Sequence, residues 1–187
     1  MTDFIRYCNQ LSPLDEQAQA DLLLSIKTKT YAKGDYLLRE GDVCNYIFFI
    51  NSGLAKIWSY REDKEFVHCF FAEDILFSVF DSFHSRTPSK FIITALENTS
   101  ATLIHFDTME SLSKKHHCIE TLFRKVTDNA TASMIKRISG ILEENAVDRY
   151  HQFIAENPSI AQRLSLGDVA KFLGITQPSL SRIRNLK

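Results

Sequence analysis

Turn signals recur so regularly through residues 27–106 that few folds other than a sheet of short antiparallel strands fit them. The signals are three glycines and a set of polar runs: Gly34, Gly41, Gly53, and residues 61–64, 72–74, 86–89 and 97–99. The segments between them are rich in Phe, Tyr, Ile and Val, which favour strands. Turns at intervals of roughly 8–12 residues are typical of a sandwich or barrel. We therefore predict that this region forms one.

Helical patterns flank the strand region on both sides. Residues 12–15 (SPLD) resemble a capping box with proline at the first helical position, which predicts a helix over residues 13–26. A short helix is expected around residues 107–113, directly after the last strand.

A much longer helix is predicted over residues 117–145. Its apolar residues recur at steps of three and four and form one stripe, which also includes Arg137: Ile119, Leu122, Phe123, Val126, Ala130, Met134, Ile138, Ile141 and Leu142. A stripe of this length needs a partner, either the same helix of a second copy or the body of its own chain. We expect part of it to pack on its own barrel and part to form a homodimer.

Two short helices around a sharp turn are predicted over residues 166–183. Gly174 supplies the turn because a left-handed backbone costs it no Cβ clash. Thr176 is suited to cap the second helix, and Pro178 falls in its first turn, where a missing N–H is harmless. This pattern is a helix-turn-helix, although two amphipathic helices with a glycine turn also serve as a plain packing unit.

The outward positions of the second helix carry residues that suit base edges and phosphates, namely Gln177, Ser179, Ser181, Arg182 and Arg184. No acidic residue lies between positions 176 and 187. Over residues 161–187, five basic residues stand against Asp168 alone, whereas the whole chain has a net charge of −1. Affinity for nucleic acid must therefore come from this local basic tip on an acidic body.

Two motif clusters resemble the Crp/Fnr family of transcription regulators. KGDYLLREGD at residues 33–42, followed by YIFFINSGLAKI at 46–57, looks like the first half of a cyclic-nucleotide-binding jelly roll. The order Arg149-Tyr150, Pro158, Gly174-Ile175-Thr176 and residues 180–184 resembles the C-terminal half. The resemblance implies an α+β chain with three parts: an N-terminal helix and antiparallel jelly-roll sensor domain (1–115), a dimerisation helix (116–145) and an all-α helix-turn-helix domain (146–187). Because the sequence ends shortly after the second helix, we expect no C-terminal β-hairpin wing.

The same resemblance implies the function and the partners. The protein would be a dimeric, sequence-specific DNA-binding regulator that recognises a two-fold-related operator in double-stranded DNA, with RNA polymerase as a further partner. Gln177, Ser181 and Arg182 would contact base edges, and Arg182 suits guanine best. The phosphate contacts would come from Thr176, Ser179, Arg184 and Lys187.

The position of the effector cassette points away from cyclic AMP. Relatives that bind it carry Gly-Glu for the ribose and Arg-Ser or Arg-Thr for the cyclic phosphate. This chain has Phe77-Ser78 and Ser89-Lys90 at those places. A small-molecule effector of another kind stays open, with Phe77, Ser78, Arg86, Ser89 and Lys90 as the candidate pocket, and so does a barrel without an effector. Arg86 and Lys90 are otherwise expected on a solvated loop.

Other classes of protein find little support in the sequence. The four cysteines form no Cys-x-x-Cys pair, and the six histidines form no His-x-His group with a carboxylate, so neither a metal site nor a cupin-like enzyme is expected. No signal peptide or membrane-length apolar run is evident, so we expect a cytoplasmic protein without membrane contact. The alternative to a DNA-binding regulator is a ligand-binding or protein-docking module whose helix-turn-helix only packs.

Overall fold

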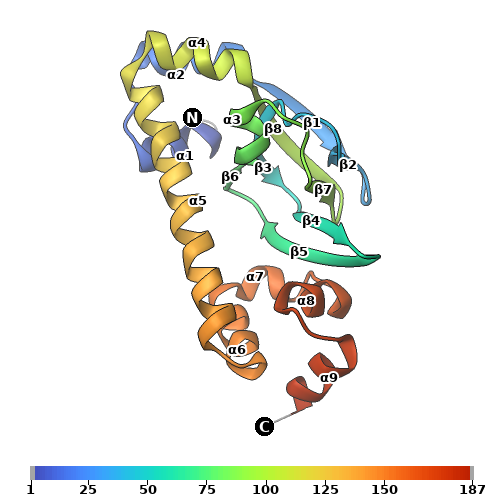
Figure 1. Ribbon diagram of the computed structural model, residues 1–187. Helices are drawn as coiled ribbons and strands as arrows, with labels where there is room; N and C mark the ends of the chain where they lie inside the picture. The colour runs from blue at the N-terminus through green and yellow to red at the C-terminus, as the bar shows by residue number, and fades with distance from the viewer. Residues whose placement is uncertain (1–2, 186–187) are drawn as a thin grey trace.

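Two four-stranded antiparallel sheets face each other in the computed structural model, which describes residues 3–185 (Figure 1). The first sheet has the order β1-β8-β3-β6 and the second the order β2-β7-β4-β5. The strands run as follows: β1 (Lys27–Tyr31), β2 (Tyr36–Leu38), β3 (Tyr46–Ser52), β4 (Ala55–Arg61), β5 (Lys64–Phe71), β6 (Leu76–Phe77), β7 (Ile92–Ala95) and β8 (Thr99–His105). The predicted antiparallel jelly roll is confirmed.

The glycines that marked the turns have the backbone geometry that turns require. Gly34, Gly41 and Gly53 have φ angles of +90°, +85° and +103°. Gly53 is also crowded, because a Cβ there would lie 2.7 Å from the carbonyl oxygen of Asn98 and from the Cα of Thr99. The β3–β4 turn therefore approaches the β7–β8 turn closely at one end of the barrel.

The central strand β3 is buried on both of its faces, which explains its unbroken apolar sequence. Phe48 stacks on Phe77 of β6, with ring centroids 5.5 Å apart. Phe49 instead meets Phe4 of α1 (Asp3–Leu11) edge to face at 5.3 Å. The barrel core thus continues into a layer of helices.

This helical layer corrects one prediction and adds an element that the sequence patterns did not predict. The helix α2 spans Glu16–Ser25 instead of beginning at residue 13, because Asp15 is its N-cap and accepts the Ala18 N–H at 2.8 Å. Residues 12–15 are therefore not a capping box with proline at the first helical position. The unpredicted element is α1, which covers β3 with Phe4, Ile5 and Cys8.

The two helices predicted directly after the strands are present as α4 (Phe106–Lys115) and α5 (His117–Glu143), and a short unpredicted helix, α3 (Phe80–Ser85), lies between β6 and β7. The helix α4 leads into α5, which is 27 residues long. The helix α6 (Ala146–Glu156) then turns back, and α7 (Pro158–Ala161) begins at Pro158.

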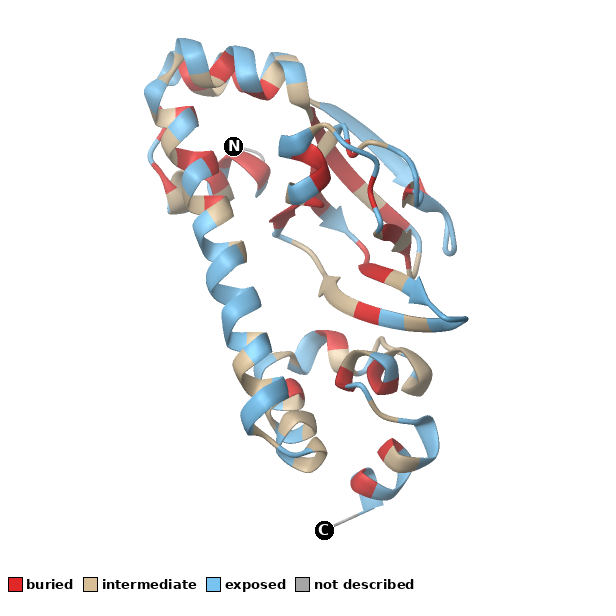
Figure 2. Ribbon diagram, viewed as in Figure 1, coloured by how far each residue is buried: buried red, intermediate tan, exposed pale blue. Residues whose placement is uncertain are grey.

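The long helix α5 divides into two halves with different environments. Figure 2 shows buried residues in its first half and mainly exposed ones further along. Ile119, Leu122, Phe123 and Val126 belong to the barrel core, as part of the predicted stripe was expected to do. Beyond them, five large apolar side chains are exposed: Met134, Ile135, Ile138, Ile141 and Leu142. Arg137 leaves the stripe and points toward β5 and the C-terminal helices.

None of the helices within residues 3–185 has the length and apolar character needed to cross a membrane. The same described residues hold no cluster of three or more His, Cys, Asp or Glu side chains arranged to bind a metal ion.

Candidate nucleic-acid interface

The C-terminal helices α8 (Leu166–Leu173) and α9 (Gln177–Asn185) form the predicted helix-turn-helix. Ser165 caps the first helix by accepting the Asp168 N–H at 3.0 Å. Gly174 ends it with a left-handed φ of +69°, and the Ile175 N–H then bonds the Ala170 carbonyl at 3.0 Å. The Thr176 hydroxyl accepts the Ser179 N–H at 3.3 Å, as expected of an N-cap.

A small apolar core fixes α9 against α8. Leu180 is fully buried among Val169, Ala170 and Leu173, and Phe153 of α6 closes the other side. Ala170 allows the two helices to approach because its side chain is a single methyl group. Because Leu180 holds one face of α9 against α8, the opposite face of α9 points away from the core.

That outer face carries most of the predicted contact residues. Thr176, Gln177, Ser181, Arg182 and Arg184 are all exposed. Ser179 is half-buried, and its hydroxyl lies 2.9 Å from the Thr176 hydroxyl and 3.4 Å from a guanidinium nitrogen of Arg182. The seventh predicted residue, Lys187, lies outside the described residues. Five of the seven thus lie on one short helix, and Thr176 caps its N-terminus.

Two arginines hold the turn of this motif, and the sequence patterns did not reveal their role. Arg137 of α5 donates to the Phe172 carbonyl at 2.7 Å, and its guanidinium lies 3.7 Å from the Phe172 ring centroid. Arg149 of α6 donates to the Leu173 carbonyl at 3.2 Å. Both cations sit at the C-terminus of α8, where unpaired carbonyls favour positive charge. No sequence signal identified them, because the contacts join positions 24 to 35 residues apart.

Three of the five residues of the candidate effector pocket are buried, namely Phe77, Ser78 and Ser89. Phe77 is buried and stacks against Phe71 at 4.0 Å as well as against Phe48. The Ser78 hydroxyl donates to the Tyr46 carbonyl at 2.9 Å, and the Ser89 hydroxyl donates to the Phe91 carbonyl at 2.8 Å. The two serines at the cassette positions are therefore buried and already paired.

The two basic residues of the cassette have different surroundings. Arg86 is not on a solvated loop, because it donates to the carbonyls of Cys44 and Phe83 at 3.0 Å and its guanidinium lies 4.1 Å from the Phe106 ring centroid. It also pairs with the side chain of Asn45. Lys90 is exposed, as expected. The contacts of Arg86 go to Cys44, Phe83, Asn45 and Phe106, whereas Ser78 and Ser89 bond Tyr46 and Phe91.

Comparison with known proteins agrees with this architecture. The model of the cyclic nucleotide-binding domain family matches residues 28–116. By sequence, no curated protein matches significantly. Among solved structures, CooA from Carboxydothermus hydrogenoformans has a TM-score of 0.71 at 16% identity over 97% of this chain and 82% of its own. FixK2 from Bradyrhizobium japonicum has a TM-score of 0.75 at 15% identity over 85% and 82%.

A third structure supplies the family name. It is a transcriptional regulator assigned to the Crp/Fnr family, from Eubacterium rectale, with a TM-score of 0.72 at 14% identity over 91% of this chain and 82% of its own. The chain has the Crp/Fnr fold. The Crp/Fnr resemblance of the two sequence motif clusters is therefore confirmed at the level of architecture, from the jelly roll through the long helix to the helix-turn-helix.

Proposed function

We propose that this protein is a sequence-specific DNA-binding transcription regulator that acts as a homodimer. The observation that carries the proposal is the outer face of α9, which exposes Arg182 and Arg184 together with Gln177 and Ser181. No acidic residue lies between Thr176 and Asn185. Arg182 would pair with guanine in the major groove, and Gln177 and Ser181 would contact neighbouring base edges. Thr176, Ser179, Arg184 and Lys187 would hold phosphates.

The second half of α5 supports the dimer. Thr127, Thr131, Met134, Ile138 and Ile141 follow one another at alternating steps of four and three, the spacing of a two-helix seam. The Thr127 and Thr131 hydroxyls already donate to the carbonyls of Phe123 and Thr127, so they enter such a seam without an unpaired donor. Met134, Ile138 and Ile141 are 47%, 50% and 52% exposed in the single chain, and a second copy of α5 would cover them.

The remaining partners follow from this role. A two-fold dimer presents two α9 helices to successive major grooves and so calls for a two-fold-related operator. RNA polymerase is the proposed further partner of such a regulator in the cytoplasm, and we assign no enzymatic activity. The filled cassette argues against cyclic AMP, so any small-molecule effector would be of another chemical class.

Substitution of two arginines on the same helix tests the proposal. Arg182→Ala should weaken binding to a selected specific duplex by about 10- to 100-fold, the equivalent of a lost bidentate base contact, and random DNA much less. Arg184→Ala is the matched control and should weaken both duplexes alike, since phosphates carry no sequence. Fluorescence anisotropy at one fixed salt concentration measures both. Equal losses of specific and random affinity for Arg182→Ala would argue against direct readout, and absence of salt-sensitive binding would favour a docking module.

A further inference from the structure

The helix-turn-helix unit is fastened to the sensor barrel of its own chain through an aromatic contact. Phe70 of β5 lies 5.2 Å from Phe172 of α8 and 6.2 Å from Phe153 of α6, measured between ring centroids. Trp58 and Val67 of the same sheet complete the apolar patch beneath Phe172. Phe70 and Phe172 pack both against the small core of the helix-turn-helix and against the apolar patch around Trp58 and Val67. The core of the helix-turn-helix is therefore continuous with the outer surface of the β4–β5 hairpin.

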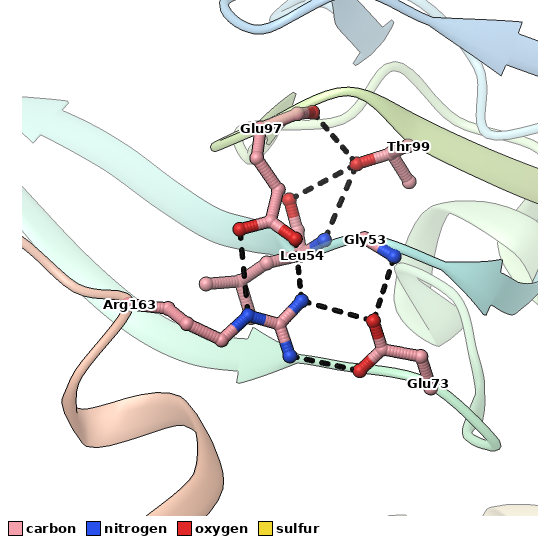
Figure 3. Close-up of polar contacts among 6 residues, drawn as sticks. All are labelled: Gly53, Leu54, Glu73, Glu97, Thr99 and Arg163. Atoms are coloured by element: carbon pink, nitrogen blue, oxygen red, sulfur yellow. Dashed lines mark hydrogen bonds and ion pairs between the residues drawn. The ribbon is translucent and has the colours of Figure 1, made fainter.

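An ion-pair cluster closes one side of this contact (Figure 3). Arg163, which precedes α8, donates two parallel hydrogen bonds to the Glu73 carboxylate, both 2.9 Å long, and also pairs with Glu97. Glu73 in turn accepts the Gly53 N–H at 2.8 Å. The Arg163 cluster (Arg163, Glu73 and Glu97) thus ties the C-terminal helices to three turns at one end of the barrel, those next to Gly53, Glu73 and Glu97.

A second cluster lies on α8 itself. The nearly buried Lys56 ammonium of β4 pairs with Glu65 of β5 at 2.5 Å and with Asp168 of α8 at 2.7 Å. Lys171, one turn further along α8, pairs with Glu65 at 2.6 Å. Desolvation lowers the pKa of Lys56, but the hydrogen bonds to Asp168 and Glu65 outweigh it and leave the pKa above its ordinary value. The ammonium therefore stays charged and holds α8 to the hairpin.

Arg137 ties the long helix to the same contact. Its guanidinium donates both to the Val67 carbonyl of β5, at 3.2 Å, and to the Phe172 carbonyl of α8, at 2.7 Å. One side chain of the proposed dimer helix thus joins the barrel to the helix-turn-helix. Figure 1 shows α9 beyond α8, on the side away from β5. Gln177, Ser181, Arg182 and Arg184 are exposed in this docked arrangement.

We propose that this docking fixes the separation and orientation of the two α9 helices in the dimer, with Arg163 as a positioning residue for operator recognition. The inference rests on the proposed function. A helix-turn-helix held only by the joint between α5 and α6 would swing and tolerate operators of several spacings. In this protein the aromatic contact and both ion-pair clusters hold the helix-turn-helix to the barrel, so α9, the helix that would read the DNA bases, has a single position. The dimer should therefore require one spacing between half-sites, without depending on an effector to set it.

Operator spacing is the readout that tests the positioning role. The wild-type protein would first select duplexes from a random-sequence pool, and the spacer between the two half-sites of the selected operator would then be changed by two base pairs. Such a change moves one half-site by about 7 Å and rotates it by roughly 70°. The wild-type dimer should lose at least about tenfold in affinity for the altered spacers, because each mismatch in placement removes contacts worth about 1–3 kcal/mol.

The expected results differ between variants. Arg163→Ala should lose less than threefold in affinity on the same altered spacers, while its affinity for a duplex with a single half-site stays within about twofold of wild type. Arg163→Lys, which keeps one ion pair but not the bidentate contact, should be intermediate. Lys136→Ala is the matched control, since it removes an exposed ion pair between α5 and α6 (Lys136–Glu156) that does not reach the barrel. Lys136→Ala should keep the wild-type spacing requirement.

Two results would overturn the inference. If Arg163→Ala binds and keeps the wild-type spacing preference, the cluster does not position α9, although the DNA-binding function stands. If the wild-type protein selects no operator, the proposed function itself fails and the inference with it. Should Arg163→Ala fail to fold, Glu73→Gln answers the same question, because its amide oxygen still accepts the Gly53 N–H while the charge that Arg163 pairs with is gone.

Discussion

Placing a charge in the seam of α5 gives the sharpest test of the dimer. Ile138 lies in the middle of the exposed apolar run and is 50% exposed in the single chain. In the proposed two-fold dimer it faces its own counterpart, so one substitution acts twice. Ile138→Asp should separate the dimer without harming the fold of the protomer, because the side chain does not belong to the barrel core.

The magnitude follows from the exposed area. Fully burying an isoleucine side chain is worth about 1.5–3 kcal/mol, so burying the remaining half is worth about 1 kcal/mol in each protomer. Two copies amount to about 2 kcal/mol, or roughly a 30-fold rise in the dimer dissociation constant. Two facing carboxylates add repulsion and desolvation, so we expect a rise of at least about 100-fold for Ile138→Asp.

Sedimentation equilibrium over a concentration series measures this constant, and the far-UV circular dichroism of the variant should match wild type. Leu24→Asp is the matched control: Leu24 is 86% exposed on α2, outside the seam. It receives the same charge and should leave dimerisation unchanged. If Ile138→Asp dimerises within about threefold of wild type, the seam does not run through Ile138 and the proposed two-fold arrangement is wrong.

Two further predictions concern the barrel end that carries the docking site. Gly53→Ala should destabilise the protein by more than about 3 kcal/mol, because its Cβ would meet backbone atoms of the β7–β8 turn at 2.7 Å. Gly34→Ala has open space around it and should cost about 1–2 kcal/mol for its left-handed backbone alone. Chemical denaturation compares the two variants, and equal losses of stability would contradict the close approach of the two turns. The hydrogen bonds from Arg163 lower the pKa of Glu73 from 4.5 to about 2. A depressed carboxylate pKa stabilises the folded state above pH 4.5 and loses that contribution as pH falls toward 2, so thermal unfolding of Glu73→Gln should depend less on pH across this window than unfolding of wild type. A variant with the wild-type slope would show that the ion pair contributes nothing to stability.

The elements with strong local signals were predictable from the sequence. Gly34, Gly41, Gly53 and Gly174 all have positive φ angles, and the turns built on them separate the strands, and α8 from α9, as expected. Turns of this kind can be predicted from the sequence because the positive φ angle they need depends on only one or two neighbouring residues. The start of α2 was misread for a related reason: both Ser12 and Asp15 are good capping residues, and the sequence alone does not say which one the helix uses.

The parts that depend on distant contacts were not predictable. Arg137 falls on the apolar stripe of α5 by periodicity, yet its carbonyl partners on β5 and α8 lie 70 and 35 residues away. Arg86 resembles a loop residue, but it wraps onto the carbonyl of Cys44, 42 residues distant. The docking of the helix-turn-helix on the barrel is of the same kind, because Arg163 meets Glu73 across 90 residues. Periodicity reports which face of an element is buried, not what buries it.

Selection of duplexes from a random-sequence pool by the wild-type protein tests the central claim most directly. We predict enrichment of a two-fold-related sequence whose half-sites are centred about one helical turn, 10–10.5 base pairs, apart. The dissociation constant of that sequence should rise steeply with salt, as expected when phosphates are neutralised by basic side chains. No enrichment over repeated rounds, or enrichment of a single asymmetric half-site bound by a monomer, would contradict a dimeric DNA-binding regulator.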